Sequence, residues 1–523
     1  MKKRALFIIG FLFLFDAILR SQSANVPLQH WVYDFLDRLQ TKGIIRDVIS
    51  FSKPYSRHEV ALMLAETVQK TKSGQEELSS TEASLFEQLK GEFHEELQAL
   101  NIHAKPRWVE RHLMSWEEKD NRIKTDLHFD QTIDTKWGGQ YERSERISQT
   151  TMGGMVRGRF QESFGFYLFA KNTLTRGKDI TQENFDPSHG APITISGKNV
   201  YSDDASAYFI WKLPWFRIEF GRDRARWGPG ARGSLMLSAH NPRFDMLRLR
   251  VQFKRFKFTS IHGKLSSGIG SKYLAAHRLE VTLFHWLIVS GSESVVYGNR
   301  GIEPAYLNPL MPYHVAEHHL GDRDNNMMSL DITAFPLKNH KFYFELFIDD
   351  FTTAKNPFTY WGNKFAFLTG WRWVTPFGLT NVDLELEYTR IEPYVYTHDD
   401  GINVYKNYDK SMGHWMGPNS DNLFIKLNHW VVHNLHWSIV SERIRKGKGD
   451  IDTPHDDSMG DRKRFLSGPV ETRWHWGIKM TGQIFKDGFL SLNYYRIVTN
   501  NLNQIPDKNF RDHQITCQLL VNY

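Results

Sequence analysis

The segment with the densest binding chemistry is residues 221–245, which contains the run GRDRARWGPG and then ARGSLMLS and NPRFD. The guanidinium groups of Arg226 and Arg232 are planar forks that can grip a carboxylate with two hydrogen bonds. Trp227 offers a flat apolar face to a sugar ring, and the glycines at 228 and 230 let the backbone turn tightly. This chemistry suits contact with an acidic glycan. It also suits a loop that folds inward and pairs its arginines with buried carboxylates.

A second segment with possible chemistry is HVAEH, which begins at His314 and matches the inverted zinc-protease pattern. Such a site needs both histidines on one helix face, a third protein ligand and an open coordination position. Pro312 precedes the pattern and Gly321 follows it closely, which disfavours a long helix. We therefore predict no catalytic zinc. A structural or adventitious metal at His314, His318 or His319 is the remaining metal hypothesis.

Other catalytic signatures do not occur in the sequence. It lacks a phosphate-binding loop, a nucleotide-binding fingerprint and a nucleophile elbow. Pairs of carboxylates such as Asp349-Asp350 occur, but neighbouring strand residues point to opposite faces. We predict a non-enzymatic protein that needs no cofactor and no metal.

The first residues have the parts of a secretory signal peptide. Residues 2–4 are basic, residues 5–15 are apolar, and small residues lead up to Ser23. We predict that residues 1–23 are a signal peptide. Cys517 is the only cysteine, so an exported chain has no intrachain disulfide to stabilise it. The formal net charge of +7 is compatible with an acidic polysaccharide partner, and export argues against nucleic acid.

Residues 24–110 have the periodicity of a small helical bundle. Trp31, Phe35 and Leu39 recur at the spacing of one helix face. Ser56 and Glu59 form a capping-box pattern before a second apolar face, and a third helix is expected from about residue 80 through Leu97. The stretch also resembles a single S-layer-homology repeat, a cell-wall-binding unit, which makes peptidoglycan a candidate partner.

From about residue 122 the apolar period changes from a helix to a strand. In residues 382–388, Val382, Leu384 and Leu386 alternate with Asp383 and Glu385. Charged residues on every second position suit a membrane barrel, with lipid outside and a polar lumen. A soluble sandwich would instead bury its alternating apolar face. The aromatic content of 14% also fits the aromatic girdles of a barrel.

The links between these segments predict the number of strands. We count about eighteen strands, with sixteen as the alternative, and the links alternate between short and long. Short periplasmic turns and long external loops are typical of outer-membrane barrels, and an even strand number returns the chain to the side on which it began. The last residues alternate up to Tyr523, which resembles the signal that barrel-assembly machinery reads.

The segment 221–245 resembles the signature of the Wzi-type capsule-assembly family. Two later stretches match as well: YLNP at 306–309 with GDRDN at 321–325, and EPYVYTH at 392–398 with GHWMGPNS at 413–420. With the helices, the resemblance covers nearly the whole mature chain. It implies an eighteen-strand outer-membrane barrel with a periplasmic helical bundle. It also implies a lectin-like protein that holds capsular or related exopolysaccharide at the cell surface.

Together, these observations predict a mainly β protein, an outer-membrane antiparallel barrel over residues 111–523, preceded by a periplasmic helical domain over residues 24–110. Its expected partners are capsular or other acidic exopolysaccharide, outer-membrane lipid and, during biogenesis, barrel-assembly machinery. The alternatives are a transport pore and a barrel enzyme acting on surface glycan. The candidate residues for glycan binding or for a loop plug are Arg222, Arg224, Arg226, Trp227, Arg232, Tyr306, Asp322 and Arg323.

Overall fold

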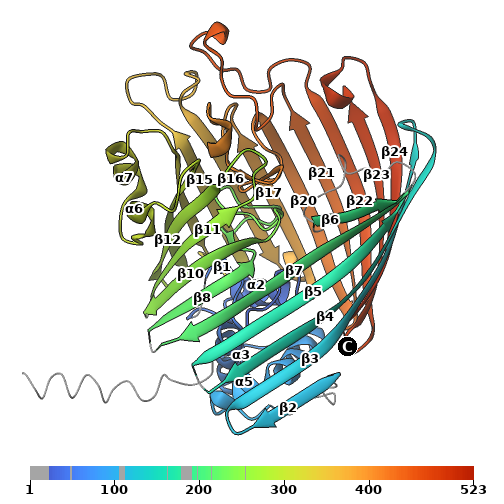
Figure 1. Ribbon diagram of the computed structural model, residues 1–523. Helices are drawn as coiled ribbons and strands as arrows, with labels where there is room; N and C mark the ends of the chain where they lie inside the picture. Colours follow the sequence, from blue (N-terminus) through green and yellow to red (C-terminus); the bar gives the residue numbers. More distant parts are fainter. Residues whose placement is uncertain are drawn as a thin grey trace, which may run out of the picture.

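The computed structural model describes residues 23–47, 50–104, 112–161, 163–177, 191–196, 198–213, 215–253 and 255–522. Long antiparallel strands close into a single barrel, and a group of helices lies in one end of it (Figure 1). Apart from Ser23, the predicted signal peptide falls outside the described residues.

Eighteen strands among the described residues form the barrel wall, as the sequence predicts, and the last strand pairs with the first to close it. In chain order they are β3 (Asn121–Gly138), β4 (Tyr141–Phe160), β5 (Phe164–Arg176), β7 (Asn199–Lys212), β8 (Phe216–Asp223), β10 (Phe244–Phe253), β11 (Phe256–Leu265), β12 (Lys272–Phe284), β13 (Leu287–Gly298), β14 (Asn325–Ala334), β15 (His340–Asp350), β16 (Lys364–Val374), β17 (Val382–Ile391), β20 (Ser420–Val432), β21 (Leu435–Lys446), β22 (Glu471–Phe485), β23 (Gly488–Asn500) and β24 (Phe510–Asn522).

Short strands lie beside this wall or inside it. β2 (Met114–Glu118) pairs with β3, and β6 (Ala191–Ser196) pairs with β7. β1 (Ser52–Lys53) pairs with β9 (Arg226–Trp227), and β18 (Lys406–Asn407) pairs with β19 (Lys410–Ser411).

The strands form because their side chains alternate between a polar interior and an apolar exterior. On β17, Asp383 and Glu387 are buried in the lumen, with exposed fractions of only 2% and 1%. Large apolar side chains lie on the outer face instead: Phe209 and Phe220 are 71% and 64% exposed. A soluble β-protein would bury such rings, so this arrangement confirms the polarity predicted for a membrane barrel.

The links between strands alternate in length as predicted. We call one end of the barrel the short-turn end, where brief turns join β4 to β5, β7 to β8, β10 to β11, β12 to β13, β14 to β15, β16 to β17, β20 to β21 and β22 to β23. The other end is the long-loop end, with extended links such as 299–324, 392–419 and 447–470.

The N-terminal helices are α2 (Val32–Lys42), α3 (Arg57–Lys72), α4 (Ser80–Glu92) and α5 (His94–Ala99). The predicted capping box at Ser56 and Glu59 begins α3, and Ser79 begins α4 in the same way. The third helix expected from the sequence is in fact two helices, because the chain leaves helical geometry at the buried Phe93. No helix in the described ranges has the length and apolarity needed to cross a bilayer.

These helices lie inside the short-turn end, at the bottom of Figure 1, and do not form a separate body below the barrel. Asp37 of α2 is 2.7 Å from Lys341 of β15 and 2.5 Å from Arg372 of β16. Glu59 of α3 is 2.7 Å from Lys257 of β11. The helices share a core that includes Val32, Phe35, Leu39, Val60, Leu64, Leu85, Leu89, Phe93 and Leu97.

Two further helices, α6 (Pro304–Leu307) and α7 (Tyr313–His319), belong to the link between β13 and β14. Their Tyr306 and Tyr313 pack on Ala275 and Val295, which point outward from the barrel wall. This link therefore folds back over the outside of the barrel, at the left of Figure 1.

Candidate functional site

The arginine-rich link between β8 and β10 folds into the lumen. Its strand β9 pairs with β1 of the N-terminal segment, with Trp227 opposite Ser52, and the Gly228 amide donates to the Phe51 carbonyl at 3.0 Å. Trp227 is 1% exposed and packs in a core with Leu235 and other lumenal side chains. Its ring therefore has no free face for a sugar.

Carboxylates on the barrel wall hold this link in place. Glu345 accepts from the amides of Leu235 and Met236, at 2.9 Å and 3.2 Å. Glu387 accepts from the amides of Ala231 and Arg232, at 2.5 Å and 3.0 Å. Backbone donors are costly to bury without a partner, and a carboxylate is a strong acceptor. These four hydrogen bonds fix the inward fold of the link.

The arginines of the segment are engaged within the chain. Arg232 donates both prongs of its fork to Glu442, at 2.8 Å and 3.1 Å, and lies over the ring of Trp415. The Nε of Arg226 donates to the Ser234 hydroxyl oxygen at 3.4 Å, and Arg224 also has a partner within the chain. Arg222, on the exterior of β8, makes a two-pronged ion pair with Asp245 and is exposed.

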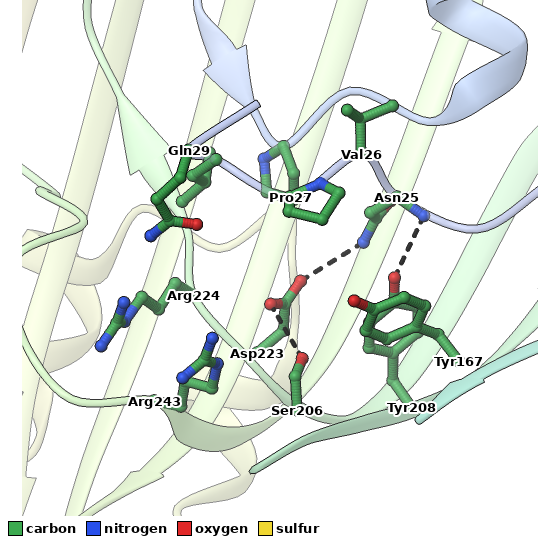
Figure 2. Close-up of a pocket in the computed structure, with 12 residues that line it drawn as sticks. Asn25, Val26, Pro27, Gln29, Tyr167, Ser206, Tyr208, Asp223, Arg224 and Arg243 are labelled. Carbon is green, nitrogen blue, oxygen red and sulfur yellow. Dashed lines mark hydrogen bonds between the residues drawn. The ribbon is translucent and has the colours of Figure 1, made fainter. Parts of the chain in front are cut away.

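The same segment meets the chain's first described residues at a small cavity (Figure 2). Asn25 donates its backbone amide to the Tyr208 hydroxyl at 3.0 Å and its side-chain amide to Asp223 at 3.4 Å. Ser206 also donates to Asp223, at 3.2 Å, and Arg243 makes an ion pair nearby with Asp204. The cavity is only about 30 Å³, enough for a water molecule but not for a sugar.

The other predicted residues lie on the outer-wall link. Tyr306 is buried and donates its hydroxyl to Asp324 at 2.8 Å, and Asp324 also receives the fork of Arg300. Asp322 and Arg323 are exposed at the end of the same link. Since the barrel wall separates them from Trp227 and Arg232, the eight predicted residues do not form one surface.

The HVAEH segment lies on α7 of this link. The rings of His314 and His318 are neighbours, 4.3 Å apart between centroids, while Glu317 points inward and is buried. Burial, reinforced by the charge of Asp322, raises the pKa of Glu317 to about 8. Across the part of the chain that the structure describes, no three His, Cys, Asp or Glu side chains are placed to hold a metal ion.

Sequence reasoning missed an aromatic group at the long-loop end, which we call the loop-tip cluster: Tyr360, Trp361, Tyr394 and His455. Trp361 and His455 stack face to face, with centroids 4.0 Å apart and an angle of 3°, and Tyr394 meets His455 edge-on at 5.1 Å. All four are partly exposed. The signal was the run FTYW at 358–361, an unusual density of aromatics in a long link.

Three long links hold this cluster together. The Trp361 amide donates to the Asp461 carbonyl at 3.2 Å, and the Lys463 amide donates to the Thr359 carbonyl at 2.9 Å. The Lys463 ammonium reaches Glu392 of a third link at 3.7 Å. Exposed cations lie beside the cluster, at Lys355, Arg462 and Arg464. At the long-loop end, contacts between three links therefore fix a surface of aromatic and charged side chains, which also includes the exposed Asp456, Asp457 and Asp461.

These features define the protein as a large outer-membrane β-barrel whose lumen is filled from both ends. A family model described as "Capsule assembly protein Wzi" matches residues 118–510, and the chain belongs to that family. A search of curated proteins gives no match.

Comparison with solved structures finds similar chains, one of which supports the barrel fold. One is Wzi of Escherichia coli, described as an outer-membrane, carbohydrate-binding β-barrel involved in group 1 capsule assembly. It has a TM-score of 0.61 at 15% identity, over 96% of this chain and 99% of that one. OccAB1 of Acinetobacter baumannii has a TM-score of 0.44 at 10% identity, over 76% and 96% of the two chains. OprD of Pseudomonas aeruginosa has a TM-score of 0.44 at 10% identity, over 77% and 94%.

Proposed function

We propose that the protein binds polysaccharide at its long-loop end and thereby holds capsular or related exopolysaccharide at the cell surface, without catalysis. The observation that carries this proposal is the filled lumen. Helices occupy one end and the link that contains Trp227 occupies the other, so a polymer has only the outer surface to contact. Membership of the capsule-assembly family and the printed description of the Escherichia coli relative support it.

The loop-tip cluster is our candidate contact surface, in place of the buried Trp227. Aromatic rings bind the apolar face of a sugar by removing it from water. Arg462 is exposed close by and would pair with a carboxylate of an acidic polymer, as would Lys355, which is 3.3 Å from Asp461 in the unbound protein. Arg222 is also exposed, on the outer face of β8, and Arg323 is exposed at the end of the 299–324 link.

The proposal includes an orientation in the membrane. Long loops face the exterior and short turns the periplasm in barrels of this kind, which would place the helices on the periplasmic side. The exposed apolar band would contact outer-membrane lipid, and the alternating β24 would be read by barrel-assembly machinery. We do not extend the proposal to peptidoglycan, because Arg57 and Glu59 of the S-layer-like stretch form ion pairs with Glu96 and Lys257 inside the barrel.

Retention of the purified, detergent-solubilised barrel on immobilised capsular polysaccharides tests this proposal. We expect Trp361→Ala with His455→Ala to weaken retention about tenfold, because the sugar would lose an aromatic face worth about 1.5 kcal/mol. Phe377→Ala is the matched control, since Phe377 is an aromatic residue 86% exposed at the short-turn end.

The outcomes of this experiment are distinct. Equal retention of the loop-tip variant and the Phe377→Ala control would place the contact surface elsewhere on the long-loop end. Failure of the unaltered protein to retain any polysaccharide, acidic or neutral, would refute the proposed function itself.

A further inference from the structure

A second cavity lies at the short-turn end, between helix α3 and the barrel wall, and has a volume of about 210 Å³. It is bounded by the start of α3, by the β7–β8 turn and by the strand ends that meet at the β10–β11 turn. The lining residues are Ser23, Ser56, His58, Glu59, Leu62, Lys212, Leu213, Trp215, Phe216, Arg217, Arg250, Gln252 and Lys257.

The charged groups around this cavity are strongly unbalanced. Lys212, Arg217, Arg250 and Lys257 all carry a positive charge, and Glu59 is the one carboxylate among the described residues that line it. Glu59 is already bound to Lys257, at 2.7 Å. The cavity therefore keeps an excess of positive charge in a partly enclosed space, which favours an anion.

Arg250 provides the second, independent observation. Its side chain is 7% exposed, and one terminal nitrogen donates to the Pro54 carbonyl at 3.0 Å. Its Nε and its other terminal nitrogen have no hydrogen-bond partner among the described residues, and the Glu59 carboxylate is 3.8 Å away. The Nε of Arg217 is likewise buried without a partner, while one of its terminal nitrogens donates to Asn25 at 2.8 Å and lies 3.4 Å from Glu219. Burying a guanidinium donor without a hydrogen-bond partner is costly, so these groups are arranged for an acceptor that the described residues do not supply.

One side of the cavity is apolar. Leu62, Leu213 and Phe216 line it, and Trp215 stands 56% exposed on the rim of the barrel. Tryptophan at the rim of a membrane barrel marks the level of the lipid headgroups. An anion in the cavity would therefore have cationic donors on one side and an apolar surface leading to the membrane interface on the other.

We propose that this cavity binds a phosphoryl anion, held by the unpartnered nitrogens of Arg250 and Arg217. Hydrogen bonds from a charged guanidinium to phosphate oxygens are short and strong. The anion would come either from a phospholipid headgroup at the membrane interface or from free phosphate. Because the site lies at the opposite end of the barrel from the loop-tip cluster, it is independent of polysaccharide binding.

Two arms of one experiment distinguish these sources, both with the full-length barrel in detergent. In the first arm, inorganic phosphate is titrated and its ³¹P resonance followed. In the second, native mass spectrometry measures retention of phosphatidylglycerol against diacylglycerol with the same acyl chains. Binding of phosphate alone assigns a free anion, and selective retention of phosphatidylglycerol assigns a lipid headgroup; either result supports the site.

Two variants and one control make the assignment specific. Arg250→Gln should weaken binding about tenfold by removing a charged hydrogen-bonding pair. Gln252→Glu adds a negative charge at the rim without removing a wall contact, and should weaken binding even if Arg250→Gln folds poorly. Arg255→Gln is the control, because Arg255 is exposed in the β10–β11 turn outside the cavity.

The proposal is overturned if neither phosphate nor phosphatidylglycerol binds. It is equally overturned if binding occurs but Arg250→Gln and Gln252→Glu leave it as strong as in the Arg255→Gln control.

Discussion

At the scale of single residues, the barrel interior is organised by wall carboxylates that accept backbone amides. Glu345 and Glu387 do this for the inward link, and Glu280 does it for the N-terminal segment by accepting from the Phe51 amide at 2.7 Å. On the outer wall, Glu293 accepts from the amides of Tyr313 and His314, at 2.8 Å and 2.6 Å. Irregular backbone inside a barrel exposes donors that no strand neighbour satisfies, and a carboxylate satisfies two at once.

We expect Glu387→Ala to lower the free energy of unfolding by about 3 kcal/mol, because the amides of Ala231 and Arg232 would be left buried without an acceptor. The Tyr343 hydroxyl, which donates to Glu387 at 2.8 Å, would lose its partner as well. Urea unfolding of the barrel followed by tryptophan fluorescence measures the change. Glu385→Ala is the control, because among the described residues Glu385 accepts no hydrogen bond from the inward link. Equal destabilisation by the two variants would contradict the prediction.

At the scale of elements, the helices are held in the barrel by ion pairs that join them to strand ends. Burial by itself would raise the pKa of Asp37, but Lys341 and Arg372 outweigh it and hold the pKa well below its usual range. Lys257 and Arg250 do the same for Glu59. A carboxylate with a lowered folded-state pKa contributes stability above its unfolded-state pKa, and this contribution is lost as the pH falls.

The attachment of the helices should therefore weaken in acid. Unfolded Asp and Glu titrate at about pH 4. The stability that Asp37 and Glu59 contribute should therefore begin to be lost near that pH, and the loss should grow at lower pH. Burial lowers the pKa of His58 to about 4. Below about pH 6.5 the unfolded state binds a proton that the folded state does not, so His58 adds a further loss of stability that begins near pH 6.5. Protease cleavage within α2 and α3, measured between pH 7 and pH 3 with an acid-tolerant protease, checks this.

Asp37→Asn provides the comparison for the acid experiment. This variant should be cleaved faster at pH 7, since Lys341 would lose its buried partner, and its cleavage should change less with pH. If cleavage of the unaltered protein stays constant from pH 7 to pH 3, the ion pairs do not hold the helices.

At the scale of the whole molecule, the two ends of the barrel are joined through its interior. The N-terminal segment contacts the inward link through the β1–β9 pair. That link in turn contacts the 392–419 loop, where the Ser238 amide donates to the Met412 carbonyl at 2.8 Å and the Tyr396 hydroxyl donates to the Leu235 carbonyl at 2.7 Å. Helices, inward link and outer loop form one continuous body inside the wall.

This continuous filling predicts an electrically closed barrel. Barrels with as many strands as porins enclose a water-filled channel only when the lumen is left open. In a planar bilayer, we expect the protein to conduct at least about ten times less than an open porin of similar strand number. A stable, ohmic conductance of porin size would favour the transport-pore alternative over surface binding.

The sequence by itself determined the barrel and its strands. Alternation in residues 382–388 and the short turns between strands are local properties, and the capping box at Ser56 and Glu59 spans only four residues, so each was correctly predicted. The break at Phe93 was missed, because it depends on how that ring packs against other helices.

Only the tertiary structure decided which residues could serve as a site. Trp227 and Tyr394 are both aromatic residues in long links, but one is buried against β1 and the other lies at the long-loop end. Asp37 and Lys341 are 304 residues apart, and nothing in their neighbouring sequence indicates that they pair. Periodicity reports which face of a strand is apolar, whereas the placement of loops and helices follows from contacts between distant segments, which arise when the barrel closes.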